Sequence, residues 1–242
     1  MLAARIDGHA IHYRLDGPWQ GADSGPVVAF SNSLGTDHRV WEPLLPHLPA
    51  NWRLLRYDTA GHGLSEHPGP RSIADHARDF AALLDRLGIG RALVVGLSVG
   101  GMIAQALAAR APERVTGLVL SNTAPKIGSA EIWDPRIAGV ERDGIAALAE
   151  AVLERWFSRR FREERPEELA LWRAMLTRTS AESYVELCRA IRDADLTPET
   201  SKLALPALCL AGGEDGSTPP ETVKAMAGLI AGARYAELPG GG

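Results

Sequence analysis

Short apolar runs alternate with amphipathic segments along most of the chain. Two such runs, at residues 2–6 and 10–15, flank Asp7-Gly8, a pair that favours a tight turn, so they are expected to form a β-hairpin. A Gly- and Pro-rich stretch at residues 17–26 predicts a loop. Further apolar runs predict strands at residues 27–30, 52–57, 93–95, 115–120, 207–211 and 233–238.

Helical patterns separate several of these strands. The clearest begins at Ser72, which forms a capping-box pattern with Asp75, and ends near Gly88. Others are expected around Trp41, directly after residue 98, and over residues 220–230. This alternation is typical of an α/β protein, in which a mostly parallel sheet carries helices on both faces.

The alternation stops between residues 125 and 201. Amphipathic helices are expected there at residues 143–156, 166–177 and 180–191, with no strand signal between them. Such a helical insertion after the sixth strand would lie over the carboxyl-terminal edge of the sheet as a cap. We therefore expect a core made of residues 1–124 and 202–242, and a helical cap made of residues 125–201.

The apolar run at 93–95 leads into Gly96-Leu97-Ser98-Val99-Gly100 and then a helix-compatible segment. A G-x-S-x-G sequence between a strand and a helix is typical of a nucleophile elbow, which makes Ser98 the candidate nucleophile. The amide of Val99, at the helix N-terminus, is a candidate oxyanion donor. A membrane span over residues 92–109 is the competing interpretation, but its glycines, serine and glutamine make it poorly hydrophobic.

Composition limits the class of protein, the partners and the compartment that are expected for this chain. The 242 residues are 45% hydrophobic and 23% charged, which is ordinary for a globular protein with a sizeable core. A net charge of −4 argues against nucleic acid or an anionic membrane as partner. An early charge at Arg5 argues against a signal peptide, and two isolated cysteines, Cys188 and Cys209, suggest no disulfide framework. We expect a cytoplasmic monomer or small homo-oligomer.

A serine nucleophile needs a base and a group that orients the base. Asp215 directly follows the strand at 207–211 and is the candidate for the orienting acid, although a surface carboxylate that caps the next helix is the plainer interpretation. The end of the strand at 115–120 offers only Ser121-Asn122-Thr123. No cluster of His, Cys and carboxylates has metal-ligand spacing, so neither a metal nor an organic cofactor is expected.

Several short sequence segments of the chain resemble those of the 3-oxoadipate enol-lactonases of the α/β-hydrolase superfamily. The resemblance covers essentially the whole sequence and rests on residues 31–37, 56–65, 96–101, 122–128, 155–157, 190–196 and 216–220. It implies a serine hydrolase that opens 3-oxoadipate enol-lactone in the catabolism of aromatic compounds, without a cofactor. It also implies that the amides of Leu34 and Val99 form the oxyanion hole and that Asp215 orients a histidine.

The resemblance further implies a small anionic substrate, so a cation is expected near its carboxylate. Lys126, Arg136 and Arg155 are candidates, although solvated helix faces would account for them equally well. Ser33, next to Leu34 in the same loop, and two tryptophans, Trp133 and Trp156, are candidates for contact with the substrate. Buried packing in the cap is the alternative interpretation for both tryptophans.

The sequence departs from the family in two places. Ala60 replaces the arginine that many relatives carry, and no histidine follows the last expected strand before the chain stops at Gly242. Of the seven histidines present, His62 is nearest to the site by loop position but resembles a structural residue of the family. The elbow leaves a general carboxylesterase and a cofactor-free perhydrolase open as alternatives, and the absent histidine adds a non-catalytic ligand-binding relative.

We expect this polypeptide to be a truncated or incompletely represented enol-lactonase, with a histidine as the next or nearly next residue. Loss of the base from a related triad costs about 10⁶ in kcat. Activity of the 242-residue chain should therefore be far below that of a chain extended to the native stop codon. Full lactonase activity from the shorter chain would contradict this expectation and place the base among the seven histidines.

Overall fold

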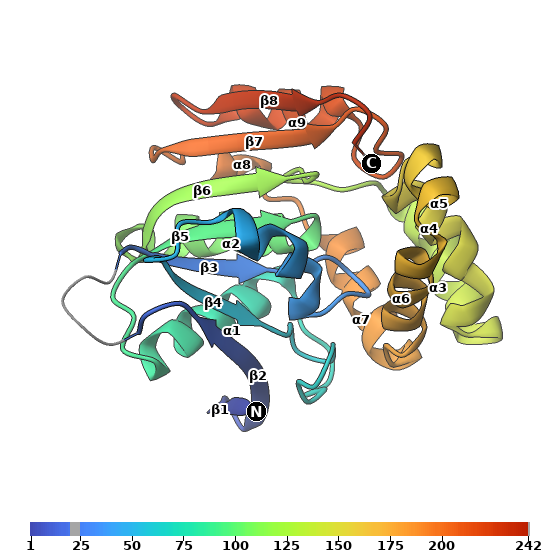
Figure 1. The fold of residues 1–242 in the computed structure, drawn as a ribbon, viewed down its shortest axis with the longest axis horizontal. Helices are drawn as coiled ribbons and strands as arrows, with labels where there is room; N and C mark the ends of the chain where they lie inside the picture. The colour runs from blue at the N-terminus through green and yellow to red at the C-terminus, as the bar shows by residue number, and fades with distance from the viewer. Residues whose placement is uncertain (20–24, 242) are drawn as a thin grey trace.

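The computed structural model describes residues 1–19 and 25–241, so half of the loop expected at 17–26 lies outside the described residues. An eight-stranded sheet forms the centre of the molecule (Figure 1). Its strands are β1 (Leu2–Ile6), β2 (His9–Asp16), β3 (Val27–Ser31), β4 (Arg53–Tyr57), β5 (Ala92–Leu97), β6 (Val115–Ser121), β7 (Ala207–Gly212) and β8 (Arg234–Leu238). Every strand expected from the sequence is present, with ends that differ by one or two residues.

The strands lie in the order β1-β2-β4-β3-β5-β6-β7-β8. Only β2 runs antiparallel to its neighbours, and the pairings from β4 through β8 are all parallel. The predicted mostly parallel sheet is thus confirmed. Because parallel strands end at one edge, the segments that follow β3, β5, β6 and β7 meet there.

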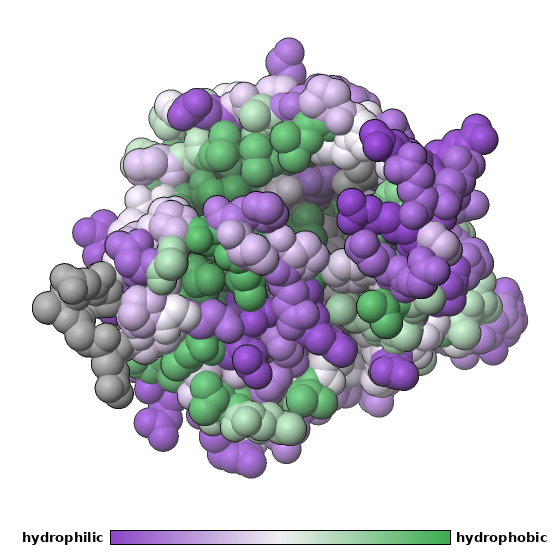
Figure 2. Space-filling model, viewed as in Figure 1, coloured by the Kyte–Doolittle hydropathy of each residue, from purple (hydrophilic) through white to green (hydrophobic). Residues whose placement is uncertain are grey.

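Helices cover the two faces of the sheet unequally. α1 (Ile73–Arg86), α2 (Val99–Arg110) and α9 (Pro220–Leu229) pack on one face over the main apolar core. The 3₁₀ helix η1 (His38–His47) packs on the other face, against β3 and β4. Farther along that second face, half-buried apolar side chains gather over β6 and β7, including Val119, Leu208 and Leu210 (Figure 2).

Local signals account for where the helices begin and how they wind. Ser72 and Asp75 form the predicted capping box at the start of α1, with each side chain bonded to the other residue's amide. The helix expected around Trp41 is present, but as a 3₁₀ helix. Pro43 and Pro46 lie inside it and cannot donate the backbone bonds of an α-helix.

The segment between β6 and β7 is helical throughout, and its main helices lie beyond the carboxyl ends of the strands (Figure 1). It contains α3 (Ala130–Asp143), η3 (Ile145–Leu148), α4 (Ala149–Trp156), α5 (Arg159–Glu164), α6 (Pro166–Thr177), α7 (Ala181–Asp193) and α8 (Thr197–Thr200). The helix expected over 143–156 was wrong in its first half. Gly144 has a φ of 77° and separates α3, which the sequence pattern missed, from the turn that leads into α4.

Pro135 and Gly139 explain why α3 escaped the sequence pattern, because both lower helix propensity in its interior. The apolar side chains of Trp133, Ile137 and Val140 are nevertheless buried, and α3 packs along α7. Tertiary packing therefore outweighs local propensity here. Among the helices of the described residues, none has the length and apolar character needed to cross a membrane.

One histidine of the loop after β4 and one of α1 are buried. His62, in that loop, and His76, on α1, are 1% and 5% exposed. Burial lowers the pKa of His62 to about 4, and burial together with the charge of His62 lowers the pKa of His76 to about 3. Both imidazoles are therefore neutral in the folded protein at pH 7.

These pKa values predict acid-sensitive stability. The unfolded chain takes up protons on both histidines near pH 6.5, whereas the folded chain does so only near pH 4 and 3, so unfolding is favoured as the pH falls. Across that window the loss of stability amounts to roughly 3 kcal/mol for His62 and roughly 5 kcal/mol for His76. Burial raises the pKa of Asp79 to about 6, which offsets part of the loss. Urea unfolding at pH 7, 5.5 and 4.5 should show the decline, and His76→Leu should flatten it. An unchanged pH slope in that variant would contradict the assignment.

Candidate active site

The turn after β5 holds Ser98 in an unusual backbone conformation. Its φ of 55° and ψ of −121° lie in a region that residues with a side chain rarely occupy, and such strain costs of order 1–3 kcal/mol. Backbone hydrogen bonds hold it there: the Ser98 amide donates to Ser121 O, and its carbonyl accepts from the Gly101 amide and the Thr123 hydroxyl. Ser98 therefore sits at a sharp strand-to-helix turn, as the sequence pattern predicts.

Three glycines make this turn possible through the lack of a side chain. A Cβ at Gly96 would collide with the carbonyl of Gly100, and a Cβ at Gly100 would collide with the carbonyl of Ser31 at the end of β3. A Cβ at Gly101 would overlap the side chain of Thr123. The elbow thus packs directly on the backbone of the neighbouring strands.

The loop after β3 lies beside the elbow and carries Leu34. Asn32, which is fully buried, ties the loop to β4 by donating from Nδ2 to Tyr57 O at 2.6 Å, and it accepts from Trp41 Nε1 at 2.7 Å. Thr36 closes the loop, because its amide and its hydroxyl both bond to Ser33 O. The Leu34 amide is therefore held in a loop with little freedom.

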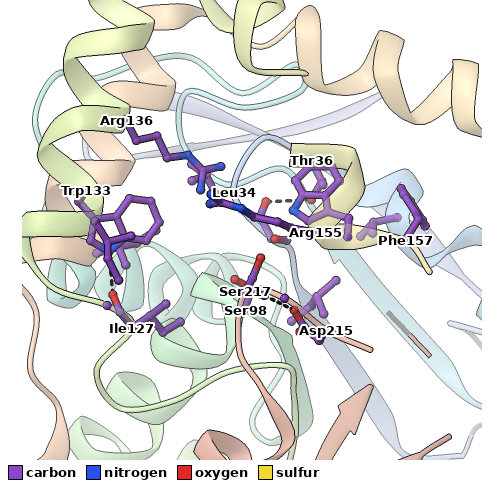
Figure 3. A pocket seen from close by; sticks show the side chains of 18 of the residues that line it. Leu34, Thr36, Ser98, Ile127, Trp133, Arg136, Arg155, Phe157, Asp215 and Ser217 are labelled. Carbon is purple, nitrogen blue, oxygen red and sulfur yellow. Dashed lines mark hydrogen bonds between the residues drawn. The ribbon is translucent and has the colours of Figure 1, made fainter. Parts of the chain in front are cut away.

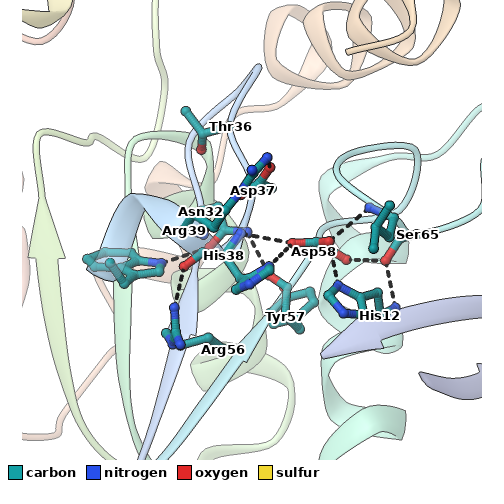
Figure 4. A network of polar contacts seen from close by, with 12 residues as sticks. His12, Asn32, Thr36, Asp37, His38, Arg39, Arg56, Tyr57, Asp58 and Ser65 are labelled. Carbon is teal, nitrogen blue, oxygen red and sulfur yellow. Dashed lines mark hydrogen bonds and ion pairs between the residues drawn. The ribbon is translucent and has the colours of Figure 1, made fainter. Parts of the chain in front are cut away.

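Asp58 anchors the far end of this loop (Figure 4). Its carboxylate accepts from the His38 amide and the His38 ring on one oxygen, and from the His12 ring and the Leu64 amide on the other, all at 2.8–2.9 Å. Burial alone would raise the pKa of Asp58, but these hydrogen bonds lower it to about 2.

The same three side chains bring three possible metal ligands within 4.8 Å of one another, a grouping that the sequence spacing did not reveal. Each ring Nδ1, however, bonds to a different oxygen of Asp58, and backbone amides occupy both oxygens as well. Hydrogen bonds therefore account for His12, His38 and Asp58 as a network that links β2, the loop after β3 and the loop after β4.

Asp215 lies in the turn after β7 and is held by four donors. One oxygen accepts from the amides of Ser217 and Thr218, and the other accepts from the Thr218 hydroxyl and from Nδ2 of Asn122 at 2.5 Å. Asn122 follows β6 and has a φ of 48°, a left-handed conformation that asparagine tolerates better than most residues. In the sequence, this position is notable only because it lacks a carboxylate. The structure shows that it instead orients the carboxylate of Asp215.

A cavity of about 530 Å³ opens above the elbow between the sheet edge and the helices that follow β6 (Figure 3). Of the predicted site residues, it brings together Ser33, Leu34, Ser98, Trp133, Arg136, Arg155, Trp156 and Asp215. The amide of Val99 is the first of α2, beside Ser98. Lys126 is not among the lining residues, because its ammonium pairs with Asp195 at the surface.

Two guanidinium groups enter this cavity from different helices. Arg136 on α3 and Arg155 on α4 extend toward one another (Figure 3). Neither forms an ion pair with any carboxylate of residues 1–19 or 25–241. Most other cap arginines do, as the pairs of Arg159, Arg160, Arg165, Arg173, Arg189 and Arg192 illustrate. The described part of the cavity lining therefore holds two guanidinium groups without an ion-pair partner and one carboxylate, that of Asp215, which leaves an excess of positive charge.

Aromatic and apolar side chains complete the lining, and sequence reasoning missed several of them. Phe157 and Trp172 belong to an aromatic cluster on α4–α6, and Val40, Ile127 and Ile191 add apolar surface. Trp172 lies on the helix expected at residues 166–177, so its position in the predicted cap could have indicated that it lines the cavity. No histidine lines the cavity within the described residues, and His62 lies buried away from it.

Comparison with known proteins places this geometry in a family. The family model described as the alpha/beta hydrolase fold matches residues 26–242, nine-tenths of the chain. The chain belongs to the α/β-hydrolase family. The predicted fold class is thereby confirmed, including the helical cap inserted after β6.

Among α/β hydrolases, this one is similar to enol-lactonases. It is 37% identical to 3-oxoadipate enol-lactonase 2 of Acinetobacter baylyi over 199 residues, which cover 82% of this chain and 74% of the relative. The crystal structure of the enol-lactonase from Burkholderia xenovorans matches with a TM-score of 0.95 and 43% identity, over 98% of this chain and 91% of that one. A putative carbamate hydrolase of Pantoea ananatis is 30% identical, over 85% of this chain and 76% of the relative.

The elbow of this α/β hydrolase predicts a sharp difference between two glycine substitutions. Gly100→Ala should force Ser31 and α2 apart, lower the free energy of unfolding by roughly 1–3 kcal/mol or more, and remove reaction at Ser98 with a fluorophosphonate. Gly228→Ala on α9 is the matched control, because a Cβ there meets nothing within 4 Å and alanine favours a helix. Equal stability and labelling in the two variants would contradict the packing described for the elbow.

Proposed function

We propose that this hydrolase opens 3-oxoadipate enol-lactone to 3-oxoadipate, with Ser98 as nucleophile, as part of the catabolism of aromatic compounds. The observation that carries the proposal is the pair of guanidinium groups, Arg136 and Arg155, that share a cavity with Ser98 and have no carboxylate partner among the described residues. A neutral ester would leave both charges uncompensated. The names of the similar proteins from Acinetobacter baylyi and Burkholderia xenovorans support the same substrate.

In the proposed reaction, Ser98 attacks the lactone carbonyl from its strained turn. The amides of Leu34 and Val99 donate to the oxyanion, and loss of one such donor typically costs about 3 kcal/mol of transition-state stabilisation. The ring opens to an enolate, which settles as a ketone and therefore needs little protonation as a leaving group. Water then hydrolyses the acyl-enzyme and releases the second carboxylate.

Asp215 is proposed to orient the general base that takes the proton from Ser98. Its four donors fix the carboxylate plane, so a ring N–H that binds it would be held in one direction. The base itself is the one triad member that no residue of the described cavity lining supplies. The hydrogen-bond network around Asp58 does not supply this base, since the rings of His12 and His38 both bond to the Asp58 carboxylate.

The carboxylate of the lactone is proposed to lie between Arg136 and Arg155. Guanidinium groups bind carboxylates through two parallel N–H donors, which adds direction to the attraction. Trp133 and Trp156 would flank the ring, and Ser33 would lie beside the oxyanion loop. We also propose that residues 125–201 act as a cap that determines specificity, over a core of residues 1–124 and 202–242 that carries the chemistry.

The test uses protein expressed from its complete coding sequence and compares the enol-lactone with p-nitrophenyl acetate. We expect kcat/KM for the lactone to exceed that for the neutral ester by orders of magnitude. Arg155→Met should lower kcat/KM for the lactone by roughly 10- to 100-fold and leave the neutral ester within a few-fold, because it removes only a charged hydrogen bond.

Ser98→Ala is the control for chemistry and should reduce turnover of both substrates by about 10⁶. Preference for p-nitrophenyl acetate in the unmodified protein would sink the lactonase proposal and favour a general carboxylesterase. A perhydrolase would instead show peroxide-dependent oxidation with a carboxylic acid present. Binding of the lactone without turnover would favour the non-catalytic alternative.

A further inference from the structure

Arg136 is held more firmly than Arg155, and the residue that holds it is Tyr184 on α7. Nη2 of Arg136 donates to the Tyr184 hydroxyl, across the contact between α3 and α7. The Arg136 guanidinium carbon also lies 5.4 Å from the centre of the Tyr184 ring and 5.2 Å from that of Trp133. Two aromatic rings and a hydroxyl therefore fix where this cation points.

Both neighbours of Arg136 are themselves fixed. The Trp133 indole donates to Ile127 O at 2.7 Å, and Tyr184 is 1% exposed. Nε of Arg136, in contrast, is buried and has no acceptor among residues 1–19 and 25–241. A buried donor without a partner is costly, so the hydrogen bond to Tyr184 and the two aromatic rings carry most of what holds this guanidinium in place.

Tyr184 also contacts the oxyanion loop. Its ring packs on Gly35, where an added Cβ would lie 3.1 Å from ring atom Cε2. Gly35 has a φ of 73° and directly follows Leu34, whose amide is the proposed oxyanion donor. One rigid side chain thus touches both the cation and the loop that would hold the oxyanion.

We propose that Tyr184 is a positioning residue that sets the distance between the carboxylate site on Arg136 and the oxyanion hole at Leu34. It acts through Arg136 and Gly35 rather than by touching the reacting atoms. Its consequence is selectivity for substrates in which an anionic group stands at a fixed distance from the scissile carbonyl, the class of short carboxy-esters and carboxy-lactones. The inference deepens the proposed function and rests on its anion site.

The experiment measures kcat and KM for Tyr184→Phe with 4-nitrophenyl monoesters of succinic, glutaric and adipic acid, beside neutral 4-nitrophenyl butyrate. Phenylalanine keeps the ring on Gly35 and removes the hydroxyl that binds Arg136. For the best monoester, KM should rise roughly 10-fold, since a hydrogen bond to a charged group is lost, while kcat and the neutral ester stay within about twofold. The preference among the three chain lengths should also flatten.

A double-mutant cycle identifies Arg136 as the group through which Tyr184 acts. In an Arg136→Met background, Tyr184→Phe should add no further loss on the monoesters. Tyr235→Phe is the matched control, because that hydroxyl contacts Glu237 on β8, outside the cavity, and its loss should change nothing. If Tyr184→Phe does not fold, Arg136→Lys keeps the charge without the planar fork and should show the same selective rise in KM.

Three results would overturn the inference: equal losses on neutral and anionic esters, no loss on either, or a full additional loss in the Arg136→Met background. Its outcome is separable from that of the proposed function. A protein that hydrolyses the enol-lactone poorly but prefers anionic monoesters, and loses that preference in Tyr184→Phe, would contradict the lactonase proposal and support the role of Tyr184. Lactone turnover that is insensitive to Tyr184→Phe would support the lactonase proposal and contradict the role of Tyr184.

Discussion

The close approach of the elbow to β3 is the constraint on which the rest of the site depends. Gly100 lies against the carbonyl of Ser31, and Gly96 lies against Gly100, so strand, turn and helix meet with no side chain between them. This contact fixes the start of α2 relative to the loop that begins at Ser31. Because the amides of Leu34 and Val99 belong to these two segments, their separation is set by backbone packing. Preorganised donors of this kind need no rearrangement when charge develops.

The buried polar network around Asp58 extends that constraint to the far side of the loop. A carboxylate with four donors, two of them from His38, keeps the end of the oxyanion loop attached to β2 and to the loop after β4. Such networks are costly to bury when any member lacks a partner and rigid when all are satisfied. Here the network holds the loop after β3 at His38, while Tyr184 of α7 contacts the same loop at Gly35.

The strands and the nucleophile turn could be predicted from sequence because both depend on local patterns. Apolar runs of four to six residues bounded by turns define the strands, and G-x-S-x-G specifies a geometry that few other residues permit. Asn122 and Tyr184 could not be found in that way. Asn122 acts through a left-handed backbone that brings its amide to Asp215, 93 positions away, and Tyr184 acts through contacts between α3, α7 and the loop after β3. The helix α3 was missed for a related reason. Pro135 and Gly139 lower its helix propensity, and its apolar face is stabilised only by burial against the rest of the fold.

The division of labour between elements has an evolutionary consequence. The strained serine and the proposed oxyanion donors lie on segments tied to the sheet, whereas Arg136, Arg155 and most of the aromatic lining lie on the segment between β6 and β7. Substitutions on those helices can change which molecule enters without disturbing the glycine contacts that make the chemistry possible. We therefore expect substitutions on these helices to change the substrate range at little cost to the fold, whereas substitutions in the elbow disrupt it. A single fold can then acquire new substrates through changes in the charge and shape of the segment between β6 and β7.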